Sequence, residues 1–257
     1  MLKIRSISVA CVAAIHIAVF ALPALAAPAL AAGGGYALVY DGPVAAEGGP
    51  AAVAAVAREL GLETRYISDL RKLPDMLKGA AFFAIGGTED DLNPLLGELG
   101  PKVVAALKEW ISGGGRYWGI CGGGYIASKG WEEESGWVKT LGLLDLDSES
   151  YIEDPDPMII SVTWLGAERS IYYQYGPAFI LREGSGVRVL ATYDDGRCAA
   201  LIADVGAGKV ALCGPHPEAD ETWLEDDPPP ADAEDWEPTL DLAVAMLKEL
   251  LSKTGGR

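Results

Sequence analysis

Residues 113–130, GGGRYWGICGGGYIASKG, contain a short apolar run that leads into a cysteine surrounded by glycines. The run at 116–120 has the length and composition of a buried strand, and a helix-like segment follows the glycines. A strand that turns sharply into a helix is a building unit of sheets whose strands run parallel. The stretch therefore predicts an α/β fold with Cys121 at the turn.

The chain before this stretch alternates between strand-like and helix-like segments. Apolar runs of strand length occupy 36–40 and 80–87, a further strand is possible at 63–67, and helix-like segments occupy 49–61, 68–77 and 100–115. Ser68 is placed to cap the second of these helices. This order predicts a mostly parallel sheet with helices on both faces. Sites in such folds lie at the carboxyl ends of strands, where Cys121 and the glycine pair 86–87 fall.

The second half of the chain is rich in short β segments separated by turn residues. These segments lie at 157–165, 170–180, 187–193, 198–205 and 209–213. They predict β-hairpins that either extend the same sheet or form a small subsheet. A strongly amphipathic helix is expected at 238–253. Because no repeat or linker demands a second domain, residues 33–257 are interpreted as one domain.

The N-terminal residues 1–32 have the pattern of an export signal. Two basic residues precede the apolar stretch, and small residues suited to cleavage follow it. We therefore expect an exported protein without an integral membrane domain after processing. The alternative is that residues 7–22 are retained as a membrane anchor.

Composition excludes some classes of partner. The formal net charge is -17, half of the residues are hydrophobic, and no basic patch is visible. A globular protein with this charge is not expected to bind nucleic acid or anionic lipid. Asn93 and Gln174 are the only two amide side chains, and depletion of these thermolabile residues predicts a host that lives in a hot environment.

Export changes the interpretation of the cysteines. Cys198 and Cys213 lie on two apolar runs joined by a short glycine turn, where they are either a disulfide or two small buried residues. In both cases Cys121 is left without a partner, and its thiol is a candidate for reactivity.

The segment 218–238 carries ten carboxylates and no basic residue. It is interpreted as a solvated, proline-broken surface loop. A calcium site is the alternative, but no regular ligand spacing supports it. No metal and no cofactor are therefore predicted.

The residues around Cys121 fit a nucleophile elbow, in which small residues flank a nucleophile on a crowded turn. The sequence Gly119-Ile120-Cys121-Gly122-Gly123 has small residues at the required positions. The following helix N-terminus would favour a thiolate and supply backbone N–H donors to an oxyanion.

The mature chain has a single histidine, His216, which also follows a predicted strand. Glu218 lies two residues further on and can orient the imidazole within a turn. A thiol nucleophile, an imidazole base and an orienting carboxylate are the parts of an activated-cysteine enzyme. One histidine with scattered cysteines does not predict a zinc site.

The segment GICGGGYIAS (119–128) with the downstream HPE (216–218) resembles the class I glutamine amidotransferase-like superfamily. FAIGG (83–87) and YYQYGPAF (172–179) are similar to its biotin-protein ligase N-terminal-like branch. The resemblance implies a flavodoxin-like fold and a Cys121–His216–Glu218 triad. It also implies that the backbones of Gly87 and Gly122 supply the oxyanion donors.

The sequence also departs from the glutaminases of that superfamily. It has Gly124 and Tyr125 where they usually carry His-Gln, which argues against glutaminase activity. Neither a synthase partner nor protein biotinylation is expected. Tyr125, Tyr175 and Gly176 are candidate substrate-binding positions, with ordinary sheet packing as the alternative for the tyrosines.

Three functional hypotheses follow. The first is an exported cysteine amidohydrolase in which Cys121 attacks an amide or γ-glutamyl carbonyl of a small or peptide-like substrate. The second is a catalytically degenerate domain that binds a small ligand or a partner, for which a separated Cys121–His216 pair or a filled pocket would argue. The third is a redox protein that uses Cys121 as a sensor thiol.

Overall fold

The computed structural model describes residues 35–224 and 236–254 of the chain. The predicted signal segment 1–32, with the alternative anchor 7–22, and the middle of the acidic segment lie outside the described residues. Within the described part, no helix is both long and apolar enough to cross a membrane.

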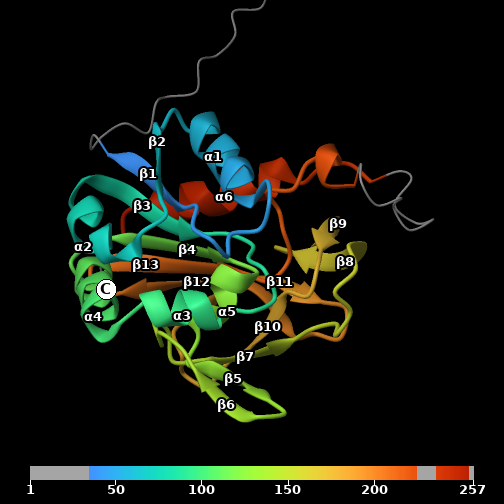
Figure 1. The fold of residues 1–257 in the computed structure, drawn as a ribbon. Helices are drawn as coiled ribbons and strands as arrows, with labels where there is room; N and C mark the ends of the chain where they lie inside the picture. Colours follow the sequence, from blue (N-terminus) through green and yellow to red (C-terminus); the bar gives the residue numbers. More distant parts are fainter. Residues whose placement is uncertain (1–34, 225–235, 255–257) are drawn as a thin grey trace, which may run out of the picture.

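A mixed sheet of 11 strands forms the centre of the molecule (Figure 1). One half is parallel and has the order β2-β1-β3-β4-β13, and the other continues as the antiparallel order β12-β11-β8-β9. The parallel strands are β1 (Tyr36–Tyr40), β2 (Thr64–Ile67), β3 (Ala80–Ile85), β4 (Arg116–Ile120) and β13 (Gly208–Cys213). The others are β12 (Cys198–Val205), β11 (Arg188–Tyr193), β8 (Met158–Trp164) and β9 (Ala167–Tyr173). The predicted α/β fold, with a parallel sheet and a hairpin extension, is confirmed.

Two smaller β elements extend from this sheet. Strand β10 (Pro177–Ile180) pairs with both β12 and β7 (Asp147–Ser150). Strands β5 (Gly130–Glu133) and β6 (Gly136–Lys139) form a separate hairpin. In Figure 1 this hairpin lies below α5 (Gly122–Ala127), on the same side of the sheet as β7.

Helices cover both faces of the sheet (Figure 1). Helices α1 (Gly49–Glu59) and α6 (Leu240–Leu251) lie on one face, and α2 (Leu73–Met76), α3 (Asn93–Glu98) and α4 (Pro101–Ser112) lie on the other. The strands supply alternate residues to the two cores, so Leu38 packs on the side of Leu107 while Val39 packs on the side of Val53. Truncating a fully buried leucine such as Leu107 to alanine would cost about 2–5 kcal/mol.

The segment after β2 differs from the predicted helix 68–77. Asp69, and not Ser68, is the capping residue, because its carboxylate accepts a hydrogen bond from the backbone N–H of Arg71. A 3₁₀ turn (Leu70–Lys72) comes first, and α2 starts afresh with a proline in its first turn. A second 3₁₀ turn (Leu77–Gly79) then leads into β3. The terminal helix is also shorter than the predicted 238–253 and occupies Leu240–Leu251.

The predicted hairpin formed by 198–205 and 209–213 is confirmed as β12 and β13. Cys198 and Cys213 are free thiols, as is Cys121. The ladder is irregular near Cys198, and the two side chains join cores on opposite faces of the sheet. Because a disulfide needs Cβ atoms that face each other, this arrangement leaves them as small buried residues.

Candidate active site

Three neighbouring parallel strands end at the same edge of the sheet and bring the predicted site residues together. Strand β4 pairs with β3 on one side and with β13 on the other. Cys121 follows β4, Gly87 follows β3 after one residue, and His216 follows β13. Residues from three distant parts of the chain therefore meet at one point, as expected for the carboxyl end of a parallel sheet.

Cys121 lies on a strained turn between β4 and α5. Its φ of 50° and ψ of -112° fall in a region that side chains other than glycine rarely adopt. Its N–H donates to the carbonyl of Cys213 at 2.8 Å, and the N–H of Gly123 donates to the carbonyl of Gly86 at 3.2 Å. A Cβ at Gly123 would lie 1.9 Å from the carbonyl oxygen of Ile85, so only glycine fits there. The neighbouring strands therefore fix the geometry of the turn.

His216 is held in place by its backbone and by Glu218. Its N–H donates to the carbonyl of Tyr172 at 2.8 Å, and its Nδ1 lies 2.9 Å from Oε1 of Glu218. Both residues are only 3% exposed. His216 and Cys121 line the same cavity and interact electrostatically. Since Nδ1 is engaged by Glu218, Nε2 is the ring nitrogen that is left for the thiol.

The neighbouring negative charges together outweigh burial in setting the pKa of His216. Burial by itself lowers the pKa of His216, but the negative charges of Glu218 and of a Cys121 thiolate raise it to about 10. The negative charge of Glu218 therefore favours an imidazolium at neutral pH.

Gly87 and Gly122 lie beside the thiol, where the resemblance placed the oxyanion donors. Gly122 is the first residue of α5, so its N–H has no intrahelical acceptor. Among the described residues, no acceptor is found for the N–H of Gly87. A Cβ at Gly87 would lie 2.9 Å from Cε1 of His216, which explains why glycine is required next to the imidazole.

A cavity of about 1480 Å³ opens above Cys121 and is lined by Gly87, Gly122 and His216. Tyr125 and Tyr175, two of the three predicted substrate-binding residues, also line it. Gly176 does not line it, and its carbonyl instead accepts hydrogen bonds from the Tyr173 hydroxyl and the Tyr151 N–H. Its contact with substrate stays a prediction.

Several contacts were not predicted from the sequence. The Cys121 thiol donates to the carbonyl of Gln174 at 3.5 Å, a backbone contact that no side-chain pattern signals. Trp223 lies in the acidic segment, with its ring centroid 5.2 Å from that of His216. All three glutamates of the run EEE at 132–134 also line the cavity, and this cluster of negative charge is visible in the sequence.

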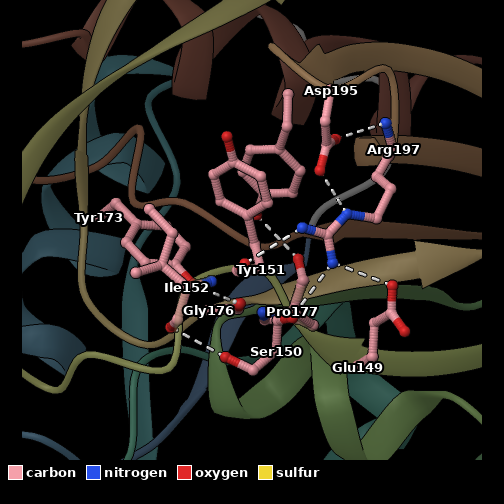
Figure 2. Close-up of polar contacts among 10 residues, drawn as sticks. Glu149, Ser150, Tyr151, Ile152, Tyr173, Gly176, Pro177, Asp195 and Arg197 are labelled. Atoms are coloured by element: carbon pink, nitrogen blue, oxygen red, sulfur yellow. Dashed lines mark hydrogen bonds and ion pairs between the residues drawn. The ribbon is translucent and has the colours of Figure 1, made fainter.

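Arg197 is the centre of a polar network at the cavity wall, shown in Figure 2. Its Nε lies 2.7 Å from a carboxylate oxygen of Asp195, and its Nη1 lies 2.9 Å from one of Glu149. Its Nη2 donates to the carbonyl of Tyr151 at 3.1 Å, and the guanidinium lies over the Tyr151 ring. The network joins β7, the segment after it and the turn before β12.

Metal ligands do not converge in the described part of the chain. Across residues 35–224 and 236–254, no three histidine, cysteine or carboxylate side chains form a group that could hold a metal ion.

Comparison with known proteins places the fold. No protein-family model and no curated protein matches the sequence. Among solved structures, one glutamine amidotransferase is 20% identical, with 84% of this chain and 99% of the other covered at a TM-score of 0.59. Another from Thermotoga maritima is 12% identical, with 86% and 99% covered at a TM-score of 0.57. A third from Methylobacillus flagellatus is 13% identical, with 88% and 98% covered at a TM-score of 0.55. At these identities the likeness is one of fold, and the chain has the α/β fold of glutamine amidotransferases.

Proposed function

We propose that the chain is a cysteine-dependent enzyme of the amidotransferase and amidohydrolase type, with Cys121 as the nucleophile. The observation that carries this proposal is that the strained Cys121 and His216 line one cavity, with His216 hydrogen-bonded to the buried Glu218. This is the arrangement that activates a thiol for acyl transfer. A fold shared with glutamine amidotransferases supports the same class of reaction.

The proposed reaction proceeds in two steps. The Cys121 thiolate attacks the amide carbon, and the N–H groups of Gly87 and Gly122 hold the oxygen that becomes negative. His216 gives its Nε2 proton to the leaving amine, and the carbon–nitrogen bond breaks to leave a thioester. His216 then takes a proton from water, whose hydroxide attacks the thioester and releases the acid and the thiolate. Glu218 keeps the imidazole oriented throughout.

The alternative of a catalytically degenerate binding domain gains no support from the geometry. Its marks would be a Cys121 sulfur remote from His216 or a filled pocket. Instead, both residues line one cavity of about 1480 Å³. The sensor-thiol hypothesis needs an oxidant to reach the same sulfur. It differs from acyl transfer in its product, which is a sulfenate and not an acyl adduct.

The finer assignments stay part of the proposal. Gly124 and Tyr125 stand where glutaminases carry His-Gln, so we propose an amide other than free glutamine as the substrate. The segments 83–87 and 172–179 support the biotin-protein ligase N-terminal-like branch, and the pattern of 1–32 supports export of one domain spanning 33–257.

The test is to trap the thioester. The protein is incubated with a library of amides and γ-glutamyl compounds, quenched in acid, and analysed by intact mass and peptide mapping. We expect an acyl adduct on the peptide that contains Cys121, absent from Cys121→Ala, and formed more slowly in His216→Ala, which lacks the acid for the leaving amine. Hydrolysis that persists in Cys121→Ala would overturn the proposal. Formation of a sulfenate with peroxide and no acyl adduct would favour the sensor hypothesis instead.

A further inference from the structure

The cavity above Cys121 is lined by far more negative than positive side chains. Eight carboxylates line it from three separate segments, against a single guanidinium, that of Arg197. They are Glu89, Asp90, Glu132, Glu133, Glu134, Asp147, Glu149 and Glu153. Two of the eight are ion-paired, Asp147 with Arg182 and Glu149 with Arg197, which leaves six without an arginine partner. The whole chain has 37 acidic and 20 basic residues, so the cavity is much more acidic than the chain average.

The one guanidinium of the lining is not free to bind a substrate carboxylate. Arg197 is held between Asp195 and Glu149 at 2.7 and 2.9 Å, and it also donates to two backbone carbonyls (Figure 2). Two carboxylates more than balance its charge. Within the described lining, an anionic group on a substrate would therefore find repulsion and no unpaired cation.

Aromatic side chains lie among these carboxylates. Trp137 is 49% exposed and Tyr175 is 39% exposed, and both line the cavity together with Trp131. The face of an aromatic ring attracts ammonium and guanidinium groups, most strongly in the case of tryptophan. Exposed rings and carboxylates together are the chemistry that recognises an organic cation.

The acidic lining is distinct from a metal site and from a general surface charge. Its carboxylates are too dispersed to converge as ligands, since no metal-binding group occurs among the described residues. The charges are also segregated, because a neighbouring hollow of about 370 Å³ is lined by Lys108, Lys129 and Lys139 with one acidic residue, Asp145.

We infer that the cavity selects amides that carry a protonated amine or guanidinium group near the scissile bond. This inference rests on the proposed function, because it names the substrate class of the same site. The cation would lie among the carboxylates that no arginine neutralises, those of the β5–β6 hairpin first, with the amide carbon over the Cys121 sulfur. Neutral amides of the same length would bind less well, and anionic ones least.

The electrostatic potential near the Cys121 thiol can be measured without any catalysis. Methanethiosulfonates transfer a thioalkyl group to a thiolate, which forms a disulfide and expels methanesulfinate. Rates are compared for the 2-aminoethyl and 2-sulfonatoethyl reagents, with Cys121→Ala correcting for other thiols and free cysteine as reference. We expect the cationic reagent to be favoured on the order of tenfold more than with free cysteine at low salt, and this preference to decrease as salt screens the charges.

The substrate arm uses three amides of one acyl group, with 1,5-diaminopentane, pentylamine and 5-aminopentanoate as the amines. The diaminopentane amide should give the highest kcat/KM. The test variant combines Glu132→Gln, Glu133→Gln and Glu134→Gln. It should lower both the preference for the diaminopentane amide and the preference for the 2-aminoethyl reagent. The control combines Glu59→Gln, Glu63→Gln and Glu109→Gln, which are exposed carboxylates outside the cavity lining and should leave both unchanged.

The two arms separate the two proposals. If the amides are hydrolysed at equal rates and the reagents react in the ratio seen with free cysteine, the inference is overturned and the proposed function stands. If no amide is hydrolysed while the cationic reagent remains preferred, the proposed function fails and the cation selectivity of the cavity stands.

Discussion

Nδ1 of His216 lies 2.9 Å from Oε1 of Glu218, and the second carboxylate oxygen of Glu218 has no hydrogen-bond partner among the described residues. A buried carboxylate with one unpartnered oxygen is poorly solvated, so its charge depends on the imidazolium beside it. The two side chains therefore form an interdependent pair, and removing the proton from His216 leaves Glu218 with an uncompensated charge.

This pairing predicts how stability changes with pH. The pKa of His216 is raised from its ordinary 6.5 to about 10, so the folded state binds this proton more tightly than the unfolded state does. The resulting stabilisation is fully present below pH 6.5 and is lost as the pH rises toward 10. We expect the free energy of unfolding, measured with urea, to fall by about 1 kcal/mol per pH unit in that window.

Glu218→Gln is the matched control for this pH dependence. It keeps the shape and a hydrogen-bonding oxygen but removes the largest of the influences that raise the pKa of His216. Cys198, whose pKa burial raises to about 12, adds its own destabilisation only above its ordinary value of 9.0. The two proteins are therefore compared between pH 6.5 and 8.5, where the free energy of unfolding of the variant should change less with pH than that of the wild type. A wild-type profile that is already flat there would contradict the raised pKa.

Sequence patterns predicted the parts of the structure that depend on local signals. The apolar runs at 36–40 and 116–120 became β1 and β4 with the same bounds, because each is short, apolar and bounded by turn residues. The convergence of Cys121 and His216 followed from a general property of parallel sheets, whose carboxyl ends share one edge.

The remaining features depend on contacts between distant segments. The network around Arg197 joins it to Glu149, 48 residues away, and no periodicity reports such a pairing. The prediction of Ser68 as the cap is wrong, because the side chain of Asp69 accepts the hydrogen bond from the N–H of Arg71, two positions ahead. Gly176 packs against Gly214, where a Cβ would lie 2.2 Å from a carbonyl oxygen, and this contact between distant segments was also not visible in the sequence.

The three described cysteines are expected to differ in reactivity. Burial raises the pKa of Cys198 to about 12 and also raises the pKa of Cys213 well above its ordinary value. Neither forms the thiolate that alkylating reagents require at neutral pH. Iodoacetamide followed by peptide mapping should therefore label Cys121 in the native protein, and the other two only after unfolding. His216→Ala should slow the labelling of Cys121 by removing the imidazole that interacts with it electrostatically.

The elbow should tolerate no side chain at Gly123. A Cβ there would lie 1.9 Å from the buried carbonyl oxygen of Ile85, so β3 and the turn must move apart. We expect Gly123→Ala to lower the free energy of unfolding by about 3 kcal/mol. Gly97→Ala is the control, because it is an exposed helical position with nothing within 4 Å, and it should stabilise by about 0.5–1 kcal/mol. Equal effects of the two substitutions would contradict the crowding of the elbow.

Trp223 is expected to keep water away from the His216–Glu218 hydrogen bond. Its ring lies 5.2 Å from that of His216 and 5.2 Å from that of Tyr172, whereas Trp236 contacts only Tyr172 of this pair, at 6.4 Å. A shielded N–H that bonds a carboxylate exchanges slowly with solvent and gives a resolved, downfield proton resonance. Trp223→Leu should broaden or abolish the resonance of the His216 Nδ1–H by admitting water. Trp236→Leu should preserve it, because that ring does not pack on the imidazole. A resonance that survives equally in both variants would show that the pair is shielded by the sheet edge alone and that Trp223 has no part in it.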